Sequence, residues 1–255
     1  MPDVLFCPNC GKTKAGIVTS GRFGCANCAL VFPEFLPRSQ IPINQLELEK
    51  FLNQTGSPEI RRNMKEIMDG NLIPDGIFRI RLARNTATFF ENDAIVKEEI
   101  RKNLMNTLAT IPGVVFENPA LGEWRAYFFD EDHLRMEKFF QGSCIINTKV
   151  QDFLDSGIFS YVPKKGYILS CPTNSIRGNK ISVVRKLSGN FLANHFLKFQ
   201  KIFPFLEFKD ESGRGFLDKN GSTVNIFAKN FNNYRKNLFY SAIYLLQEME
   251  GENNL

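Results

Sequence analysis

Three short motifs in this chain carry residue types that could do chemistry. The first is FRIRLARN, residues 78–85, in which Arg79 and Arg81 alternate with apolar residues. In a β-strand, two residues at this spacing point to the same face. Two parallel guanidinium groups bind phosphate well, because each can donate paired hydrogen bonds. The pattern favours a polyphosphate-binding strand; the alternative is a solvated edge strand guarded by basic residues.

The second motif is the acidic run DEDHLR, from Asp130 to Arg135, directly after WRAYFF. Three consecutive acidic side chains repel one another unless a cation compensates them. One interpretation is a divalent metal site, and another is a carboxylate pocket for a basic substrate. A third is an ordinary solvated turn in which His133 and Arg135 compensate the charge within the run itself.

The third motif is GYILSCPTN, residues 166–174. Its β-prone run ends at Cys171, and Pro172 cannot continue a helix or a central strand. Arg177 and Lys180 follow in a polar turn. A thiol beside two cations suits an anionic or polar ligand, whereas the alternative is a structural cysteine with a solvated basic loop.

The amino-terminal segment holds two Cys-x-x-Cys pairs, which are Cys7 with Cys10 and Cys25 with Cys28. Each pair can place two thiolates on one metal ion. Two pairs joined by a short hairpin, here expected in GIVTSGRFG, complete a closed tetrahedral zinc site with four ligands. Because four thiolates leave no open position, the predicted role is structural. A disulfide framework and a thioredoxin-like redox pair are the competing interpretations.

Composition limits the function classes. The chain has 255 residues, of which 43% are hydrophobic, as expected for one or two globular domains. No apolar run approaches the ~20 residues that cross a bilayer, and MPDVLFCPNC lacks the features of a secretory signal. We therefore expect a cytoplasmic protein. The net charge of +5 permits nucleotide, nucleic-acid or acidic-protein partners but requires none, and 25 Phe residues indicate aromatic packing in the core.

The elements that position these motifs can also be predicted. Ser57 as N-cap, Pro58 at the first helical position and Gly70 at the end predict a helix over 57–69. Apolar periodicity predicts further helices, and β-prone runs predict strands. The helices are expected within 46–52, 91–113, 150–157, 188–203 and 231–250. The strands are expected around 78–85, 114–118, 124–129 and 181–184, with a hairpin over 159–170.

FRIRLARN, DEDHLR and GYILSCPTN, in this order, resemble the phosphagen (guanidino) kinase family, and most closely its bacterial branch, the protein arginine kinases. In that family a Ser-x-Arg-x-Arg strand, an Asn-Glu-Glu-Asp-His-Leu-Arg turn and a Cys-Pro-Thr/Ser-Asn loop build one active site. A later Arg-Gly-x-x-Gly-Glu loop closes over it. The doubled Cys-x-x-Cys segment looks like the zinc-binding activator protein of the bacterial arginine kinase. The kinase resemblance covers about residues 71–250.

This resemblance implies an α+β fold, with an antiparallel sheet flanked by helices and preceded by a small four-cysteine zinc ribbon. It also implies an ATP-dependent phosphotransferase that acts on a guanidinium group, most closely a protein arginine kinase. The implied cofactors are ATP, Mg²⁺ and Zn²⁺. The implied partners are proteins with arginine side chains and factors of protein quality control, with no membrane and no expected nucleic acid. The implied division is a zinc ribbon at 1–35, a linker with short helices at 36–70 and a reduced catalytic domain at 71–255.

The resemblance also implies individual roles. The residues implied to bind ATP phosphates are Arg79, Arg81, Arg135, Lys180 and Arg214. Those implied to act on the guanidinium are Glu131, which binds and orients it, Cys171, the adjacent thiol, and Asp218, a substitute for the second carboxylate. The implied metal ligands are Cys7, Cys10, Cys25 and Cys28.

Several positions depart from the family pattern. Phe129 and Asp130 replace Asn-Glu, and Phe78 replaces the serine before the first arginine. Lys180 offers a point charge where the family has an arginine fork. Asp218-Lys219 stands where Gly-Glu is expected. A second hypothesis follows from these departures: a catalytically weak adaptor that binds nucleotide or arginine side chains and recruits a partner through its zinc ribbon.

Overall fold

A computed structural model describes residues 6–37, 42–55, 57–142, 146–211 and 221–251. The chain forms two compact units. The first comprises Met1–Arg38, Ile80–Phe139 and Cys144–Lys180, and the second comprises Ser39–Arg79, Phe140–Ser143 and Ile181–Leu255. Arg214, Asp218 and Cys144 lie outside the described residues.

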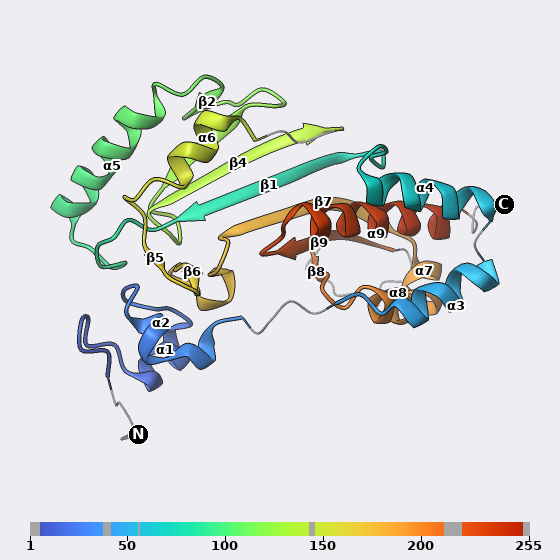
Figure 1. Ribbon diagram of the computed structural model, residues 1–255, viewed down its shortest axis with the longest axis horizontal. Helices are drawn as coiled ribbons and strands as arrows, with labels where there is room; N and C mark the ends of the chain where they lie inside the picture. The colour runs from blue at the N-terminus through green and yellow to red at the C-terminus, as the bar shows by residue number, and fades with distance from the viewer. Residues whose placement is uncertain (1–5, 38–41, 56, 143–145, 212–220, 252–255) are drawn as a thin grey trace. The chain divides into compact units, whose positions relative to one another are not determined.

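The main sheet has seven strands in the order β2-β3-β4-β1-β7-β9-β8 (Figure 1). β3 pairs with β4, and β8 with β9, in antiparallel fashion, while the short β2 runs parallel to β3. The strands are β1 Ile77–Arg84, β2 Val114–Val115, β3 Trp124–Phe128, β4 Leu134–Gln141, β7 Asn179–Leu187, β8 Glu207–Asp210 and β9 Ser222–Lys229. β5 Tyr161–Val162 and β6 Gly166–Tyr167 form the predicted hairpin. The α+β class with a mostly antiparallel sheet is confirmed.

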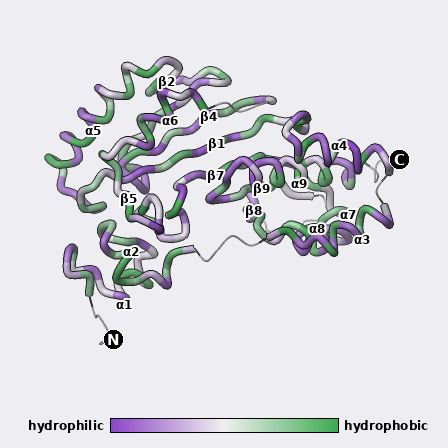
Figure 2. Tube along the Cα trace, viewed as in Figure 1, coloured by the Kyte–Doolittle hydropathy of each residue, from purple (hydrophilic) through white to green (hydrophobic). Residues whose placement is uncertain are grey.

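In the first unit, two capped helices accompany the strands. α5 (Ala94–Leu108) begins at Asp93, whose side chain accepts a hydrogen bond from the N–H of Val96, and α6 spans Thr148–Leu154. α5 buries Ile100, Leu104 and Leu108. Their spacing of four residues places them on one face, so α5 is amphipathic, and Figure 2 shows hydrophobic and hydrophilic residues alternating along it.

The second unit contains most of the remaining helices. They are α3 Gln45–Thr55, α4 Pro58–Asp69, α7 Gly189–Asn194, α8 Phe196–Ile202 and α9 Asn233–Gly251. The predicted caps of α4 are confirmed: Ser57 accepts from the N–H of Ile60, and Gly70 adopts φ 84°. α4 packs against α9 (Figure 1), where Asn63 Nδ2 donates to the hydroxyl of Tyr244 at 2.9 Å.

Aromatic rings fill the core of the second unit, as the phenylalanine content predicted. Phe78 on β1 contacts Phe140, Phe239 and Tyr240, with ring centroids 5.9, 6.3 and 5.0 Å away. The single helix expected over 188–203 is instead two helices, because His195 ends α7 with a non-helical backbone (φ −121°, ψ −24°) before α8 begins.

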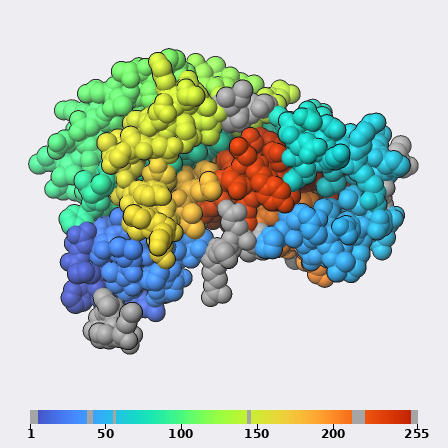
Figure 3. Space-filling view, viewed as in Figure 1, coloured from blue at the N-terminus to red at the C-terminus, as the bar shows by residue number. Residues whose placement is uncertain are grey.

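The four-cysteine segment differs from the prediction. The expected hairpin between its cysteine pairs is wrong: residues Lys14–Ser20 form the helix α1, which has Thr13 as N-cap and Gly21 in the left-handed region as C-cap. These caps satisfy backbone groups that would otherwise need strand partners. α2 (Cys28–Val31) and the 3₁₀ helix η1 (Pro33–Phe35) follow. Within the first unit, this segment lies against the chain around β5 and β6 (Figure 3).

None of the helices in the described ranges combines the length and the apolar character needed to span a bilayer.

Candidate functional site

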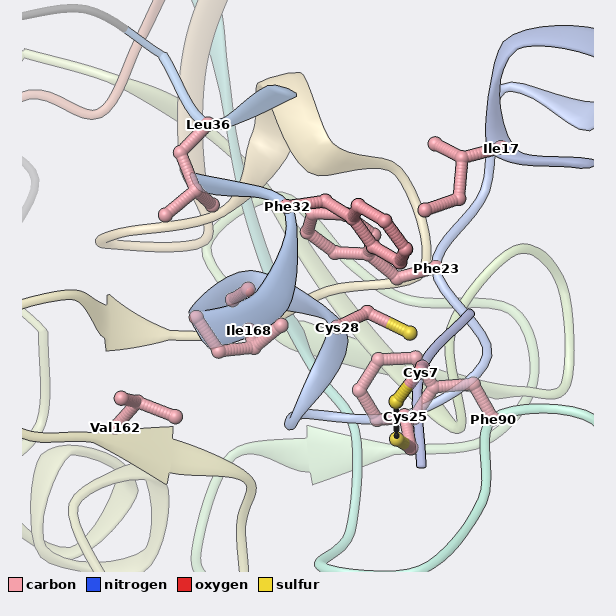
Figure 4. Close-up of a cluster of buried hydrophobic side chains, with 11 residues drawn as sticks. Cys7, Ile17, Phe23, Cys25, Cys28, Phe32, Leu36, Phe90, Val162 and Ile168 are labelled. Atoms are coloured by element: carbon pink, nitrogen blue, oxygen red, sulfur yellow. Dashed lines mark hydrogen bonds between the residues drawn. The ribbon is translucent and has the colours of Figure 1, made fainter. Parts of the chain in front are cut away.

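The four amino-terminal cysteines converge on one point, and Figure 4 shows three of them, Cys7, Cys25 and Cys28. Their Sγ atoms all lie within 4.8 Å of one another. Cys7 Sγ is 3.8 Å from Cys25 Sγ, and Cys10 Sγ is 3.4 Å from Cys28 Sγ. With a Zn–S bond of about 2.3 Å, the edge of an ideal tetrahedron measures about 3.8 Å. The spacing therefore fits a zinc ion held by four thiolates.

The surroundings of these sulfur atoms also suit a metal-bound thiolate cluster. Asn9 Nδ2 donates to Cys25 Sγ at 3.2 Å, and Asn27 Nδ2 donates to Cys7 Sγ at 3.5 Å. Such donors stabilise the negative charge on ligand sulfur. Burial raises the pKa of Cys10 and raises that of Cys28 to about 11, whereas hydrogen bonds from Asn27 and from nearby backbone groups outweigh burial at Cys7 and lower its pKa to about 7. Among the described residues, this is the one cluster with the composition of a metal site.

The cysteine cluster shares a hydrophobic core with later parts of the first unit. Phe23 and Phe32 pack in one buried cluster with Phe90, Val162 and Ile168 (Figure 4). Two backbone hydrogen bonds add to this contact: the N–H of Phe23 donates to the carbonyl of Ser170 at 2.8 Å, and the N–H of Phe90 donates to the carbonyl of Gly24 at 2.9 Å.

β1 carries the first predicted motif. Phe78, Ile80 and Leu82 are buried, whereas Arg79 and Arg81 are half-buried. The alternation confirms that both arginines lie on one face of the strand and that the apolar residues lie on the other. Arg81 Nη2 lies 3.9 Å from Glu131 Oε2.

The acidic motif forms the turn between β3 and β4, and its three carboxylates diverge. Asp130 pairs with Arg135. Glu131 faces Arg81 and also accepts from Asn174 Nδ2 at 3.5 Å. Asp132 points into the interior. These carboxylates do not converge as a three-carboxylate metal site would, so the metal interpretation of this turn has no support in the described residues.

Arg135 is held by more than one group on the sheet face. Besides Asp130, its Nε lies 3.2 Å from Glu137 Oε1. Its guanidinium also stacks 4.2 Å from the ring centroid of Tyr127, its cross-strand neighbour on β3. Two carboxylates therefore compensate the positive charge of Arg135 without any ligand.

The Cys171 loop leads from β6 into the 3₁₀ helix η2 (Pro172–Asn174). Cys171 is partly buried, and its Sγ lies 3.2 Å from Thr173 Oγ1. η2 places Asn174 against Glu131, so the acidic turn meets this loop directly. Ile176 adopts φ 92°, a strained conformation for a β-branched residue that often accompanies functional loops.

The site contains buried polar residues that motif reasoning did not single out. Asn85 and Asp132 are almost fully buried, and Asn85 Nδ2 donates to Asp132 Oδ1 at 3.0 Å. Burial raises the pKa of Asp132. Burial also lowers the pKa of His133 to about 4, so this imidazole is neutral at physiological pH. Asn85, Asp132 and His133 all belong to the motifs FRIRLARN and DEDHLR, but nothing in the sequence indicated that the two motifs contact each other through these residues.

The remaining predicted residues are distributed as follows. Lys180 is half-buried at the start of β7. Arg214 and Asp218, predicted for the closing loop, lie outside the described residues. The structure therefore brings together Arg81, Glu131, Asn174 and the Cys171 loop within the first unit. The roles assigned to them stay predictions.

A cavity of about 740 Å³ opens beside the acidic turn in the first unit. Its lining combines Lys97 and Arg101 from α5 with Phe116, Phe128 and Arg135. Cations next to aromatic rings provide a mixed environment that is open to a charged organic ligand.

Comparison with known proteins identifies the fold. No protein-family model and no curated protein matches the sequence. Among solved structures, substrate-free duplicated taurocyamine kinase from Schistosoma mansoni matches 90% of this chain with a TM-score of 0.57 and 14% identity. The fold is that of a guanidino kinase.

Two further matches have similar identities. The same taurocyamine kinase with bound transition-state analogue components gives a TM-score of 0.52 over 78% of this chain at 15% identity. Lombricine kinase gives a TM-score of 0.49 over 71% of this chain and 67% of its own, also at 15% identity. This chain spans 41% and 35% of the two taurocyamine kinase chains.

Proposed function

We propose that this protein is an ATP-dependent phosphotransferase that acts on guanidinium groups, and most specifically a protein arginine kinase of the cytoplasm. The observation that carries the proposal is the meeting of Glu131 with Arg81 and with Asn174 of the Cys171 loop, on a fold like that of taurocyamine kinase. A carboxylate, a phosphate-binding cation and a thiol loop are the groups that such a reaction needs.

The chemistry follows from the charges of these residues. A protonated, delocalised guanidinium is a poor nucleophile, so the Glu131 carboxylate holds it and favours displacement of its proton. Cys171 adds a polarisable group at the same position. Bound ATP with its Mg²⁺ supplies the phosphoryl group, and cations stabilise that group during transfer. In this proposal Arg79, Arg81, Arg135, Lys180 and Arg214 contact the phosphates, and Asp218 supplies the second carboxylate.

A polypeptide acceptor is the more specific part of the proposal. The amino-terminal four-cysteine segment resembles an activator that works on a protein-directed kinase, and zinc is its metal in this proposal. Substrates with exposed arginine side chains and components of protein quality control are then the expected partners.

The direct test is incubation of the full chain with ATP, Mg²⁺ and an unstructured arginine-rich protein, followed by detection of acid-labile phosphate. Phosphoarginine on the acceptor is the expected result. Free arginine and taurocyamine serve as small-molecule acceptors in parallel, since labelling of these alone would contradict the polypeptide specificity. Intact ATP binding without any transfer would overturn the kinase function.

Glu131→Gln tests the site itself. The substitution keeps the size of the side chain but removes its charge, and we expect transfer to fall by at least about 100-fold, the lower end of typical general-base effects. Glu99→Gln, at an exposed position on α5 that does not line the cavity, is the matched control and is expected to keep full activity. Equal activity of wild type and Glu131→Gln would remove Glu131 from the reaction.

A specific observation also favours the second candidate, a catalytically weak adaptor. Arg135 is already compensated by Asp130 and Glu137, which reduces the positive charge available to ATP phosphates. If this pairing persists in the presence of nucleotide, the protein binds arginine side chains or nucleotide without efficient transfer. ATP binding together with an absence of phosphoarginine identifies the adaptor.

A further inference from the structure

Ser170, the residue before Cys171, is bound by three different segments of the first unit. Its backbone N–H donates to Asp132 Oδ1 at 2.8 Å. Its hydroxyl accepts from Asn85 Nδ2 at 3.1 Å. Its carbonyl accepts from the backbone N–H of Phe23 at 2.8 Å. Ser170 is only 4% exposed, so these bonds form away from water, where losing a partner is most costly.

The three partners come from the three parts of the candidate site. Asp132 follows Glu131 in the acidic turn. Asn85 directly follows β1, the strand that carries Arg81. Phe23 belongs to the four-cysteine segment. A single residue next to the thiol thus connects the carboxylate, the phosphate-binding strand and the metal-binding segment.

Asn85, directly after β1, adds further hydrogen bonds between the segments that meet at Ser170. Its side chain is 1% exposed and donates from Nδ2 to both Asp132 and Ser170. Its Oδ1 accepts the backbone N–H of His133 at 2.9 Å. One amide therefore satisfies groups of the acidic turn and of the Cys171 loop at the same time, which fixes the distance between them.

The four-cysteine cluster is connected to Ser170 and Phe90 through two consecutive residues, Phe23 and Gly24. Phe23 donates to Ser170, and the carbonyl of Gly24 accepts the N–H of Phe90. A methyl group added at Gly24 would lie 2.9 Å from Cys10 Sγ, so the backbone here packs directly on a cluster sulfur. The conformation of residues 23 and 24 consequently depends on how the four sulfur atoms are held.

We propose that Ser170 is the positioning residue for Cys171, and that the metal-loaded four-cysteine segment is one of its three supports. The assignment of Cys171 to the guanidinium rests on the proposed function, but the positioning itself does not. Loss of the Asn85 amide, of the Ser170 hydroxyl or of the metal then loosens the loop and exposes the Cys171 thiol.

The test is the alkylation rate of Cys171 by iodoacetamide in the full-length, zinc-loaded protein, followed by peptide mass mapping. We expect Asn85→Ala and Ser170→Ala each to raise this rate about tenfold, the factor that corresponds to roughly one buried hydrogen bond. Asn63→Ala removes a comparable partly buried amide bond to Tyr244 in the second unit and is expected to leave the rate within twofold of wild type.

A second experiment needs no substitution: zinc is removed from the wild-type protein with a chelator. We again expect the alkylation rate of Cys171 to rise about tenfold. Rates within twofold of wild type, or slower, in the variants or after zinc removal would overturn the corresponding support. Alkylation requires no ATP turnover, so the two proposals can fail separately. If the variants are alkylated faster but the wild-type protein transfers no phosphate, the kinase function is refuted and the positioning role of Ser170 stands.

If the wild-type protein is active, Asn85→Ala is expected to lower kcat about tenfold and to leave the KM for ATP within twofold.

Discussion

Asp130, Glu131 and Asp132 are consecutive in the sequence, but each carboxylate has a different partner. Asp130 faces Arg135, Glu131 faces Arg81, and Asp132 is buried against Ser170. Their mutual repulsion is avoided because the turn directs them apart. At the scale of single residues, the three acids differ in exposure as well as in partner: Asp130 is exposed, Asp132 is buried, and Glu131 is half-buried beside the Cys171 loop.

Arg81→Ala tests the phosphate-binding role of β1. A hydrogen bond to a charged group contributes about 1.5–3 kcal/mol, so we expect ATP affinity to fall by roughly 10- to 150-fold. Isothermal titration with ATP and Mg²⁺ measures this change. Arg62→Ala, in an exposed position on α4, is the control, and equal ATP affinity in the two variants would contradict the assignment.

His133 predicts a specific dependence of stability on pH. Burial lowers its pKa from 6.5 to about 4, so between these values the unfolded chain binds more protons than the folded one. The stability that the neutral imidazole contributes is therefore present above pH 6.5 and is lost as the pH falls toward 4. Between pH 7.5 and 5 the expected loss is about 2 kcal/mol.

Urea denaturation at both pH values measures this effect. His133→Gln is expected to show a smaller loss of stability on acidification than wild type, by the same ~2 kcal/mol. The chain has one other histidine, His195, and His195→Gln is expected to retain the pH dependence of wild type. Identical pH dependence in wild type and His133→Gln would contradict the prediction.

At the scale of elements, the Cys171 loop is held by a close backbone approach. Gly166 begins β6 with φ 82°, and an added Cβ would collide with the carbonyl of Ile176. Tyr167 and Ile176 also exchange two backbone hydrogen bonds, of 2.9 and 2.8 Å. The strained Ile176 conformation is thereby fixed across the base of the loop.

Gly166→Ala is expected to destabilise the protein by clearly more than Gly113→Ala. Both glycines have positive φ, at 82° and 76°, but an added Cβ at Gly113 meets nothing within 4 Å. The left-handed backbone alone costs about 1 kcal/mol in each case, so the difference isolates the contact with Ile176. Thermal or chemical denaturation measures it, and equal losses in the two variants would refute the steric argument.

The local elements were the most predictable part of this fold. Ser57 and Gly70 fix the ends of α4 because capping depends on neighbouring residues alone. The alternation around Arg79 and Arg81 likewise gave the face of β1, and the cysteine spacing gave the converging sulfurs. The helix α1 was missed because GIVT is β-prone, while the caps at Thr13 and Gly21 favour a helix.

Contacts between distant segments were the unpredictable part. The bond from Asn85 to Ser170 joins residues 85 positions apart, and Phe23 meets Ser170 across an even longer interval. No periodicity or spacing encodes such pairs, since they depend on how strands are ordered in the sheet. The motifs therefore indicated candidate residues, and the structure showed that Arg81, Glu131 and the Cys171 loop lie together and that Asn85, Asp132 and Ser170 bond beside them.

At the scale of the whole molecule, the four-cysteine segment is predicted to need its metal in order to fold. We expect one zinc ion per chain in freshly purified protein, measured by atomic absorption. Cys28→Ser is expected to lose this zinc and to lower the unfolding temperature, because binding energy of a structural zinc is also folding energy. Val18→Ser, at an exposed position on α1, is the control. Full zinc content in Cys28→Ser would contradict the four-thiolate site.

The core shared by Phe23, Phe32, Phe90, Val162 and Ile168 has a consequence for synthesis of the protein. The amino-terminal segment leaves the ribosome first, but the residues that complete its core emerge only when the chain has been made as far as Ile168. Until then its phenylalanines lack the cover that Phe90, Val162 and Ile168 supply, and transiently exposed hydrophobic surface makes a chain prone to aggregation. Ribosome-bound chains halted before Val162 should therefore expose apolar surface to chaperones, whereas chains halted well beyond Ile168 should not.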